Sequence, residues 1–131
     1  MIRRSHALIL VALSVLGALL FACSGGGSSS VPSVPSVTGK SVYWAAPQYF
    51  TDNTPLDPSR DLQWFEIFIK EDPSFGPLDT PVDTASPLDN TYNLAKVSPP
   101  LLNGVTYYVS LRAVTVDGMK SDYSTPVYFS P

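Results

Sequence analysis

The fold is decided by residues 105–116, whose sequence is VTYYVSLRAVTV. Alternate positions place one set of side chains on the same side of an extended chain: Tyr107, Val109, Leu111 and Ala113. The positions between them face the other way: Tyr108, Ser110 and Arg112. Because the side chains of a β-strand have a period of two, this pattern predicts a long strand with one face on a core. The turn-forming pair Asp117-Gly118 follows it.

Shorter strands with the same alternation are predicted at residues 41–47, 62–70, 91–97 and 126–129. In the first of them Val42 and Trp44 share one face, and Tyr43 lies on the other. Residues 72–87 are rich in proline and polar side chains, so we expect a long loop there. Several short strands without a helical period predict an all-β fold, an antiparallel β-sandwich.

Composition excludes several functional classes. The chain has 131 residues with 8 basic and 11 acidic side chains. Without residues 1–22, which contain Arg3 and Arg4 but no acid, the balance is 11 acidic against 6 basic side chains, or −5. An acidic chain without a basic cluster is a poor nucleic-acid binder, because such binding depends on neutralising phosphates.

Histidine and cysteine are almost absent. The one histidine is His6 and the one cysteine is Cys23. A chain without residues 1–22 therefore has neither a Ser/His/Asp nor a Cys/His nucleophile system, and no histidine to ligate a metal. A single cysteine also excludes a structural zinc site. We expect no enzyme activity, no cofactor and no metal.

The N-terminus has the features of a secretory signal. Arg3 and Arg4 precede an apolar run at residues 7–21, which only Ser14 and Gly17 interrupt. Fifteen residues are too few to span a bilayer comfortably, since a spanning helix needs about 20. An uncleaved membrane anchor is the alternative interpretation of this run.

The end of the run, Leu20-Phe21-Ala22-Cys23, resembles the lipobox of bacterial lipoproteins. That pattern has leucine at −3, a small residue at −1 and cysteine at +1, and Phe21 departs from it at −2. The resemblance implies that Cys23 becomes the lipidated first residue, carrying a diacylglycerol on its thiol and a fatty acid such as palmitate on its amine. It also implies, through Ser24, sorting to the outer membrane if the source is Gram-negative. A secreted protein with an unused thiol is the alternative.

These features divide the chain into three parts. Residues 1–22 are the expected lipoprotein signal peptide, and residues 37–131 are the expected domain. Residues 23–36 are the lipidated cysteine and a linker, SGGGSSSVPSVPS, whose glycine and serine predict flexibility. Such a linker would span about 20 Å on average. It would hold the domain away from a lipid surface.

Residues 37–131 resemble a fibronectin type III domain, which is an immunoglobulin-like β-sandwich. The resemblance rests on Val42, Trp44 and Pro47 in the second strand of that family and on the run from Leu101 to Ala113 before and within its sixth. It implies three core positions: Trp44 between the sheets, Phe65 on the third strand and Tyr107 at a tyrosine corner. The first strand is short or missing before Lys40, and the loop of residues 48–61 is longer than usual. The family consists of binding modules and spacers, which implies no catalysis.

Two surfaces are candidate binding sites. The first is the outward face of the third, sixth and seventh strands of that family, which share a sheet; its aromatic residues are Trp64, Phe68, Tyr108 and Tyr128. Exposed flat rings stack sugars or anchor protein partners. The alternative is that these rings only favour strand pairing.

The second surface is the loop of residues 49–61, with Asp52, Asp57 and Asp61. Loop carboxylates can bind Ca²⁺, but their spacing matches no EF-hand and fits ordinary turn chemistry. A glycosidase would need two acids about 5–9.5 Å apart beside a cleft, which a lone small sandwich rarely has.

The sequence thus predicts a lipid-anchored protein of the bacterial cell envelope that displays one binding module for a protein or glycan partner. The alternative is a structural spacer or subunit of an envelope assembly, acting through pairing of sheet edges.

Overall fold

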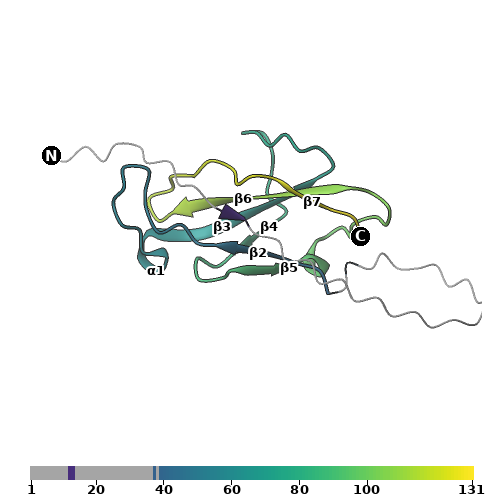
Figure 1. The fold of residues 1–131 in the computed structure, drawn as a ribbon, viewed down its shortest axis with the longest axis horizontal. Coiled ribbons are helices and arrows are strands. Elements are labelled where there is room, and N and C mark those ends of the chain that lie inside the picture. The colour runs from purple at the N-terminus through teal and green to yellow at the C-terminus, as the bar shows by residue number, and fades with distance from the viewer. Residues whose placement is uncertain (1–11, 14–36, 38) are drawn as a thin grey trace, which may run out of the picture.

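The computed structural model describes residues 12–13, 37 and 39–131 (Figure 1). They form two antiparallel sheets packed face to face, so the prediction of an all-β, immunoglobulin-like sandwich is confirmed. The smaller sheet has the order β1-β2-β5, with β1 at Ala12–Leu13, β2 at Ser41–Ala45 and β5 at Thr91–Asn93. The larger sheet has the order β4-β3-β6-β7. Its strands are β4 at Asp83–Ala85, β3 at Leu62–Lys70, β6 at Tyr107–Thr115 and β7 at Val127–Phe129.

The longest pairing in the sandwich joins β3 to β6. It extends from Leu62 opposite Thr115 to Lys70 opposite Tyr108, with one irregularity between Leu62 and Trp64. Both strands alternate apolar side chains toward the other sheet, and that alternation fixes their register because a slip of one residue would turn the apolar set to the other face.

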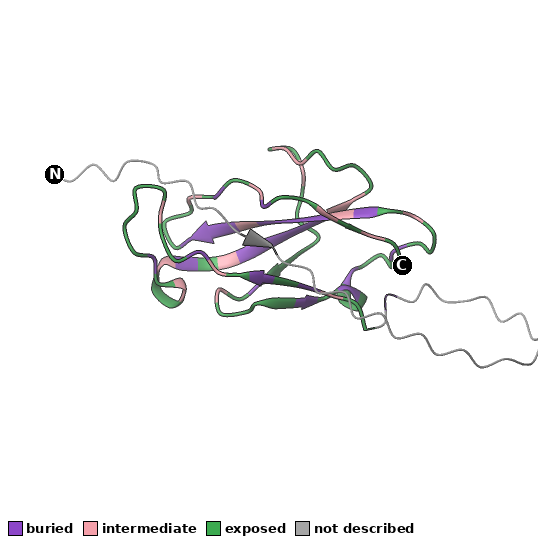
Figure 2. Cartoon of the chain, in the orientation of Figure 1, coloured by how far each residue is buried: buried purple, intermediate pink, exposed green. Residues whose placement is uncertain are grey.

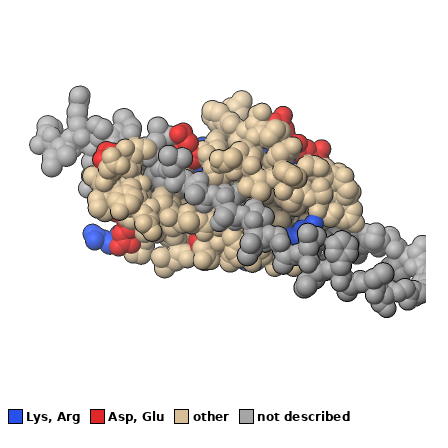
Figure 3. All heavy atoms as spheres, viewed as in Figure 1, with Lys and Arg blue, Asp and Glu red and all other residues tan. Residues whose placement is uncertain are grey.

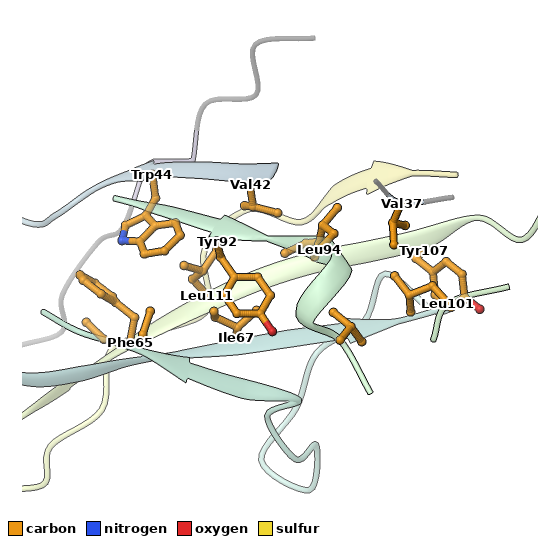
Figure 4. Packing of buried hydrophobic residues seen from close by; sticks show 14 of the residues in the cluster. Val37, Val42, Trp44, Phe65, Ile67, Tyr92, Leu94, Leu101, Tyr107 and Leu111 are labelled. Atoms are coloured by element: carbon orange, nitrogen blue, oxygen red, sulfur yellow. The ribbon is translucent and has the colours of Figure 1, made fainter. Parts of the chain in front are cut away.

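The core lies between the two sheets (Figure 2). Trp44 from β2 meets Phe65 from β3 edge to face, with ring centroids 5.5 Å apart, an arrangement that adds about 0.5–1.5 kcal/mol to the burial of the rings. Tyr107, the third residue expected in the core, is also buried, and its hydroxyl accepts a hydrogen bond from the Leu102 amide at 3.1 Å. Figure 4 shows Tyr107 beside Leu101, well away from Trp44 and Phe65.

The structure corrects three expectations. Part of the expected loop at residues 72–87 is a strand, β4, whose Asp83 accepts a hydrogen bond from the Tyr92 hydroxyl across the two sheets. The strand expected at residues 91–97 ends at Asn93, because that side chain caps a 3-10 turn at Leu94–Lys96. The long loop after β2 contains a short helix, α1 at Pro58–Asp61, with Asp57 as its N-cap and proline at its first position.

A further strand, β1, comes from the apolar N-terminal run, where no strand was expected. Ala12 pairs with Ala45 and Leu13 pairs with Trp44, at the edge of β2 that faces away from β5. The sequence had predicted only that the first strand of the sandwich is short or missing before Lys40.

The strands define two ends of the domain. At one end, the Val37 end, Lys40 donates a hydrogen bond to the Ser130 carbonyl, so both termini of residues 37–131 lie there. At the other end, the Val116 end, the Val116 amide donates to the Asp61 carbonyl and holds the turn after β6 against α1. Figure 1 shows α1 at one extremity of the sandwich and the C-terminus toward the other.

Candidate functional site

The expected lipidation site, Cys23, lies outside the residues that the structure describes, as do the linker of residues 24–36 and most of the expected signal peptide. The candidate sites that the structure does describe are the outer face of the larger sheet and the loop of residues 49–61.

The sheet register places the four predicted aromatic residues at separate points of that outer face. Trp64 lies opposite Val114 and Phe68 opposite Ser110, with the ion-paired Glu66 between them on β3. Tyr108 lies between Lys70 and Tyr128. Only Tyr128 is strongly exposed, at 72%. The four rings therefore do not form one continuous platform.

Phe68 is not on the surface, although the sequence predicted an exposed ring. It is 1% exposed because Tyr123 and Phe75 cover it, with ring centroids 5.0 and 6.3 Å away. The Tyr123 hydroxyl donates to the Gly76 carbonyl at 2.8 Å, which joins the segment after β6 to the loop after β3. A ring buried in this way stabilises the fold and is not free to contact a partner.

A charge cluster around the buried Glu66 lies beside Phe68. Both Nε and Nη2 of Arg112 donate to one carboxylate oxygen of Glu66, at 2.9 and 2.7 Å, and Nζ of Lys120 donates to the other at 2.7 Å. The Arg112 guanidinium also lies over the rings of Phe68 and Tyr123, 5.2 and 4.8 Å from their centroids. Burial raises the pKa of Glu66, but the hydrogen bonds and charges of Lys120 and Arg112 outweigh burial and leave that pKa below its ordinary value.

Of the predicted aromatic face, one tyrosine pair stays accessible to a partner. Tyr108 and Tyr128 lie with ring centroids 6.4 Å apart, near the Val37 end of the domain. Trp64 is half-buried, and its indole Nε1 is buried without a hydrogen-bond partner among the described residues.

In the loop of residues 49–61 the carboxylates are occupied by local hydrogen bonds. Asp52 accepts from the Thr54 amide and hydroxyl, and Asp57 accepts from the Ser59 amide and hydroxyl. These hydrogen bonds, the hydroxyl ones first, lower the pKa of both carboxyl groups. Asp61 accepts from the Asp57 amide at 2.8 Å. This is turn and helix-cap chemistry, and no group of three potential metal ligands occurs among the described residues.

Exposed apolar side chains also occur at the Val116 end. Tyr49 is 59% exposed and Val116 is 54% exposed. A bridge between Tyr49 and Pro55 closes the tip of the loop after β2 into a small hairpin. On the face drawn in Figure 3, the charged side chains of the described residues are few and lie in small groups, with uncharged surface between the groups.

Sequence reasoning missed the residues that cover the outer face. These are Phe75 and Tyr123. Ser121 and Ser124, which flank Tyr123, continue the pairing of β6 beyond β7, because their hydroxyls accept hydrogen bonds from the Ala113 and Leu111 amides. Neither the loop after β3 nor the segment after β6 alternates apolar and polar residues. No local sequence pattern therefore predicts that these segments pack on the sheet.

Comparison with protein-family models, with curated protein sequences and with solved structures found no match. Among the described residues, no helix is both long enough and apolar enough to span a lipid bilayer.

Proposed function

We propose that this protein is a lipid-anchored lipoprotein of the bacterial cell envelope that displays a single fibronectin type III-like domain as a binding module for a protein or glycan partner. The observation that carries the proposal is the position of Cys23, which follows a lipobox-like tripeptide and precedes a glycine-serine linker and an immunoglobulin-like domain. Two or more acyl chains on this residue would anchor the domain stably, at about 0.8 kcal/mol per buried CH₂.

Two contacts support the assignment to the fibronectin type III-like subgroup. Trp44 fills the space between the sheets against Phe65, as the resemblance implies. The Tyr107 hydroxyl is hydrogen-bonded to the backbone five residues upstream, which is the contact that defines a tyrosine corner.

We propose the Val116 end as the partner-binding surface, in preference to the aromatic sheet face. The linker would join the domain at Val37, and β3 separates the two ends by about 27 Å, at about 3.4 Å per residue for an antiparallel strand. The loop of residues 49–61 would therefore be held away from the lipid, whereas Tyr108 and Tyr128 lie on the membrane side. Tyr49 and Val116 give this end the exposed apolar groups that anchor protein or sugar partners.

The experiment that tests the anchor is the intact mass of the protein from a bacterial membrane fraction, measured beside a Cys23→Ser variant. We expect a chain that begins at Cys23 and carries acyl mass, and a variant that keeps residues 1–22 and gains no acyl mass. An unmodified chain released in soluble form would contradict the proposal.

A structural subunit that acts through edge pairing remains the second candidate. One observation favours it, namely the pairing of β1 with the outer edge of β2.

A further inference from the structure

The outer edge of β2 is paired only with β1, and β1 consists of two residues from the apolar N-terminal run. In the proposed lipoprotein, cleavage before Cys23 would remove those residues. The smaller sheet would then consist of β2 and β5, because no other described strand borders β2.

The backbone of β2 shows which groups would lose their partners. The Trp44 amide donates to the Asn90 carbonyl and the Lys40 carbonyl accepts from the Leu94 amide, so these residues direct their backbone groups toward the β5 side. Successive residues of a strand direct their N–H and C=O groups to opposite edges. Ser41, Tyr43 and Ala45 therefore direct theirs toward the outer edge.

This edge lacks the features with which proteins protect sheet edges, such as charge, proline and short length. Residues Ser41–Ala45 include neither a charged residue nor a proline. By contrast, β4 and β7 have three residues each, with Asp83 inside β4 and Pro126 directly before β7. The edge also borders the core, since Val42 and Trp44 are both buried.

We infer that the outer edge of β2 is a strand-binding site, which in the processed protein takes an extended apolar segment of a partner protein as an added antiparallel strand. This inference rests on the proposed function, because processing is what vacates the edge. Main-chain hydrogen bonds would supply the affinity. Side chains opposite Trp44 would lie on the core-facing side of the sheet and select for apolar residues.

An apolar segment is favoured over the linker as the occupant for two reasons. The residues that the structure pairs with β2 belong to the apolar run, and Ala12 and Leu13 are both apolar. The linker has Pro32 and Pro35 within six residues of Val37, and proline has no N–H to donate to a sheet.

The test is amide hydrogen exchange, measured by NMR on the lipidated protein in detergent micelles after its mass has shown where it begins. The probe is a peptide with the sequence of residues 9–16, ILVALSVL, flanked by lysines for solubility. The control is the same peptide with an N-methyl group at the position of Ala12, which removes the N–H that would pair with Ala45. Val42 and Trp44 are internal controls, because their amides face β5.

We expect the probe to slow exchange at Tyr43 and Ala45 by about tenfold or more, and the N-methylated peptide to have little effect. No slowing with either peptide would overturn the inference. Protection of both amides without any peptide would also overturn the inference. Protection that does not change with protein concentration would indicate that the linker occupies the edge. Protection that increases with protein concentration would indicate a second copy of the chain.

The mass distinguishes this failure from a failure of the proposed function. A chain that retains residues 1–22 would refute the processing step and with it the vacant edge. A chain that begins at Cys23 but shows no response to the probe would refute the strand-binding site alone.

Discussion

At the scale of single residues, Trp44 holds the two sheets together. It is 4% exposed and packs edge to face on Phe65, so Trp44→Ala should lower the free energy of unfolding by about 3–5 kcal/mol. Urea denaturation measures this change. The control is Tyr43→Ala, since Tyr43 is the exposed neighbour on the same strand and its loss should cost less than about 1 kcal/mol. Similar costs for the two variants would contradict the assigned faces of β2.

The charge of Glu66 contributes to the fold, because its carboxylate binds two cations. Glu66→Gln should lower the free energy of unfolding at pH 7 by about 3 kcal/mol, the low end for loss of one partner of a buried ion pair, since Lys120 is partly exposed. Glu71→Gln, at an exposed acid on the adjoining loop, should change it by less than about 0.5 kcal/mol.

The stability lost in the Glu66→Gln variant should depend on pH. The folded-state pKa of Glu66 lies below its ordinary value of 4.5, so its stabilising contribution is present above about pH 4.5 and is lost as the pH falls through the folded-state pKa. The difference in urea midpoint between wild type and Glu66→Gln should therefore shrink between pH 7 and pH 3. A difference that stays constant over this range would show that the cost of the substitution is steric.

At the scale of elements, the outer face of the larger sheet is covered by a second layer of packed side chains. Phe75 from the loop after β3 and Tyr123 from the segment after β6 cover Phe68 on this face and contact each other, with ring centroids 5.8 Å apart. Lys70 adds an ion pair to Asp79 at 2.8 Å and lies over the Phe75 ring. The layer holds the loop after β3 against the sheet.

Tyr123→Ala should release that loop while the sandwich stays folded. The substitution removes the ring that contacts both Phe68 and Phe75 and the hydroxyl that holds Gly76. We expect chymotrypsin to cut after Phe75 about tenfold faster or more, because local opening exposes the bond. Tyr128→Ala, which removes a largely exposed ring, is the matched control. Equal cleavage rates for the two variants would mean that Tyr123 does not retain the loop.

At the scale of the whole molecule, the two ends of the sandwich should differ in distance from the lipid. Thr51 is exposed in the loop at the Val116 end, and Asn103 is exposed in the connection that leads to Tyr107 at the other end. The natural Cys23 thiol is consumed by lipidation in the proposed protein, so Thr51→Cys and Asn103→Cys each provide a single site for a dye.

Energy transfer from these dyes to a labelled lipid in vesicles should be weaker from position 51 than from position 103. The physical reason is the separation of the two ends by about 27 Å along β3, with the lipid attached on the Val37 side. Equal transfer from both positions would show that the domain lies flat on the membrane, and the Val116 end would then lose its advantage as a binding surface.

The sequence by itself determined the long strands and their core faces. Alternation in residues 62–70 and 105–116 is a local property, and a period of two admits only one assignment of faces once one side must be buried. The resemblance to a fibronectin type III domain implied that Trp44, Phe65 and Tyr107 are core residues, and all three are buried.

Only the tertiary structure decided what covers the other face and the edges. Local alternation says that Phe68 points away from the core, but it cannot show that Tyr123, 55 residues later in the sequence, folds back over it. The same holds for β1, whose pairing with Trp44 and Ala45 joins segments about 30 residues apart. Contacts between distant segments depend on the path of the connecting chain, and a pattern of neighbouring residues does not determine that path.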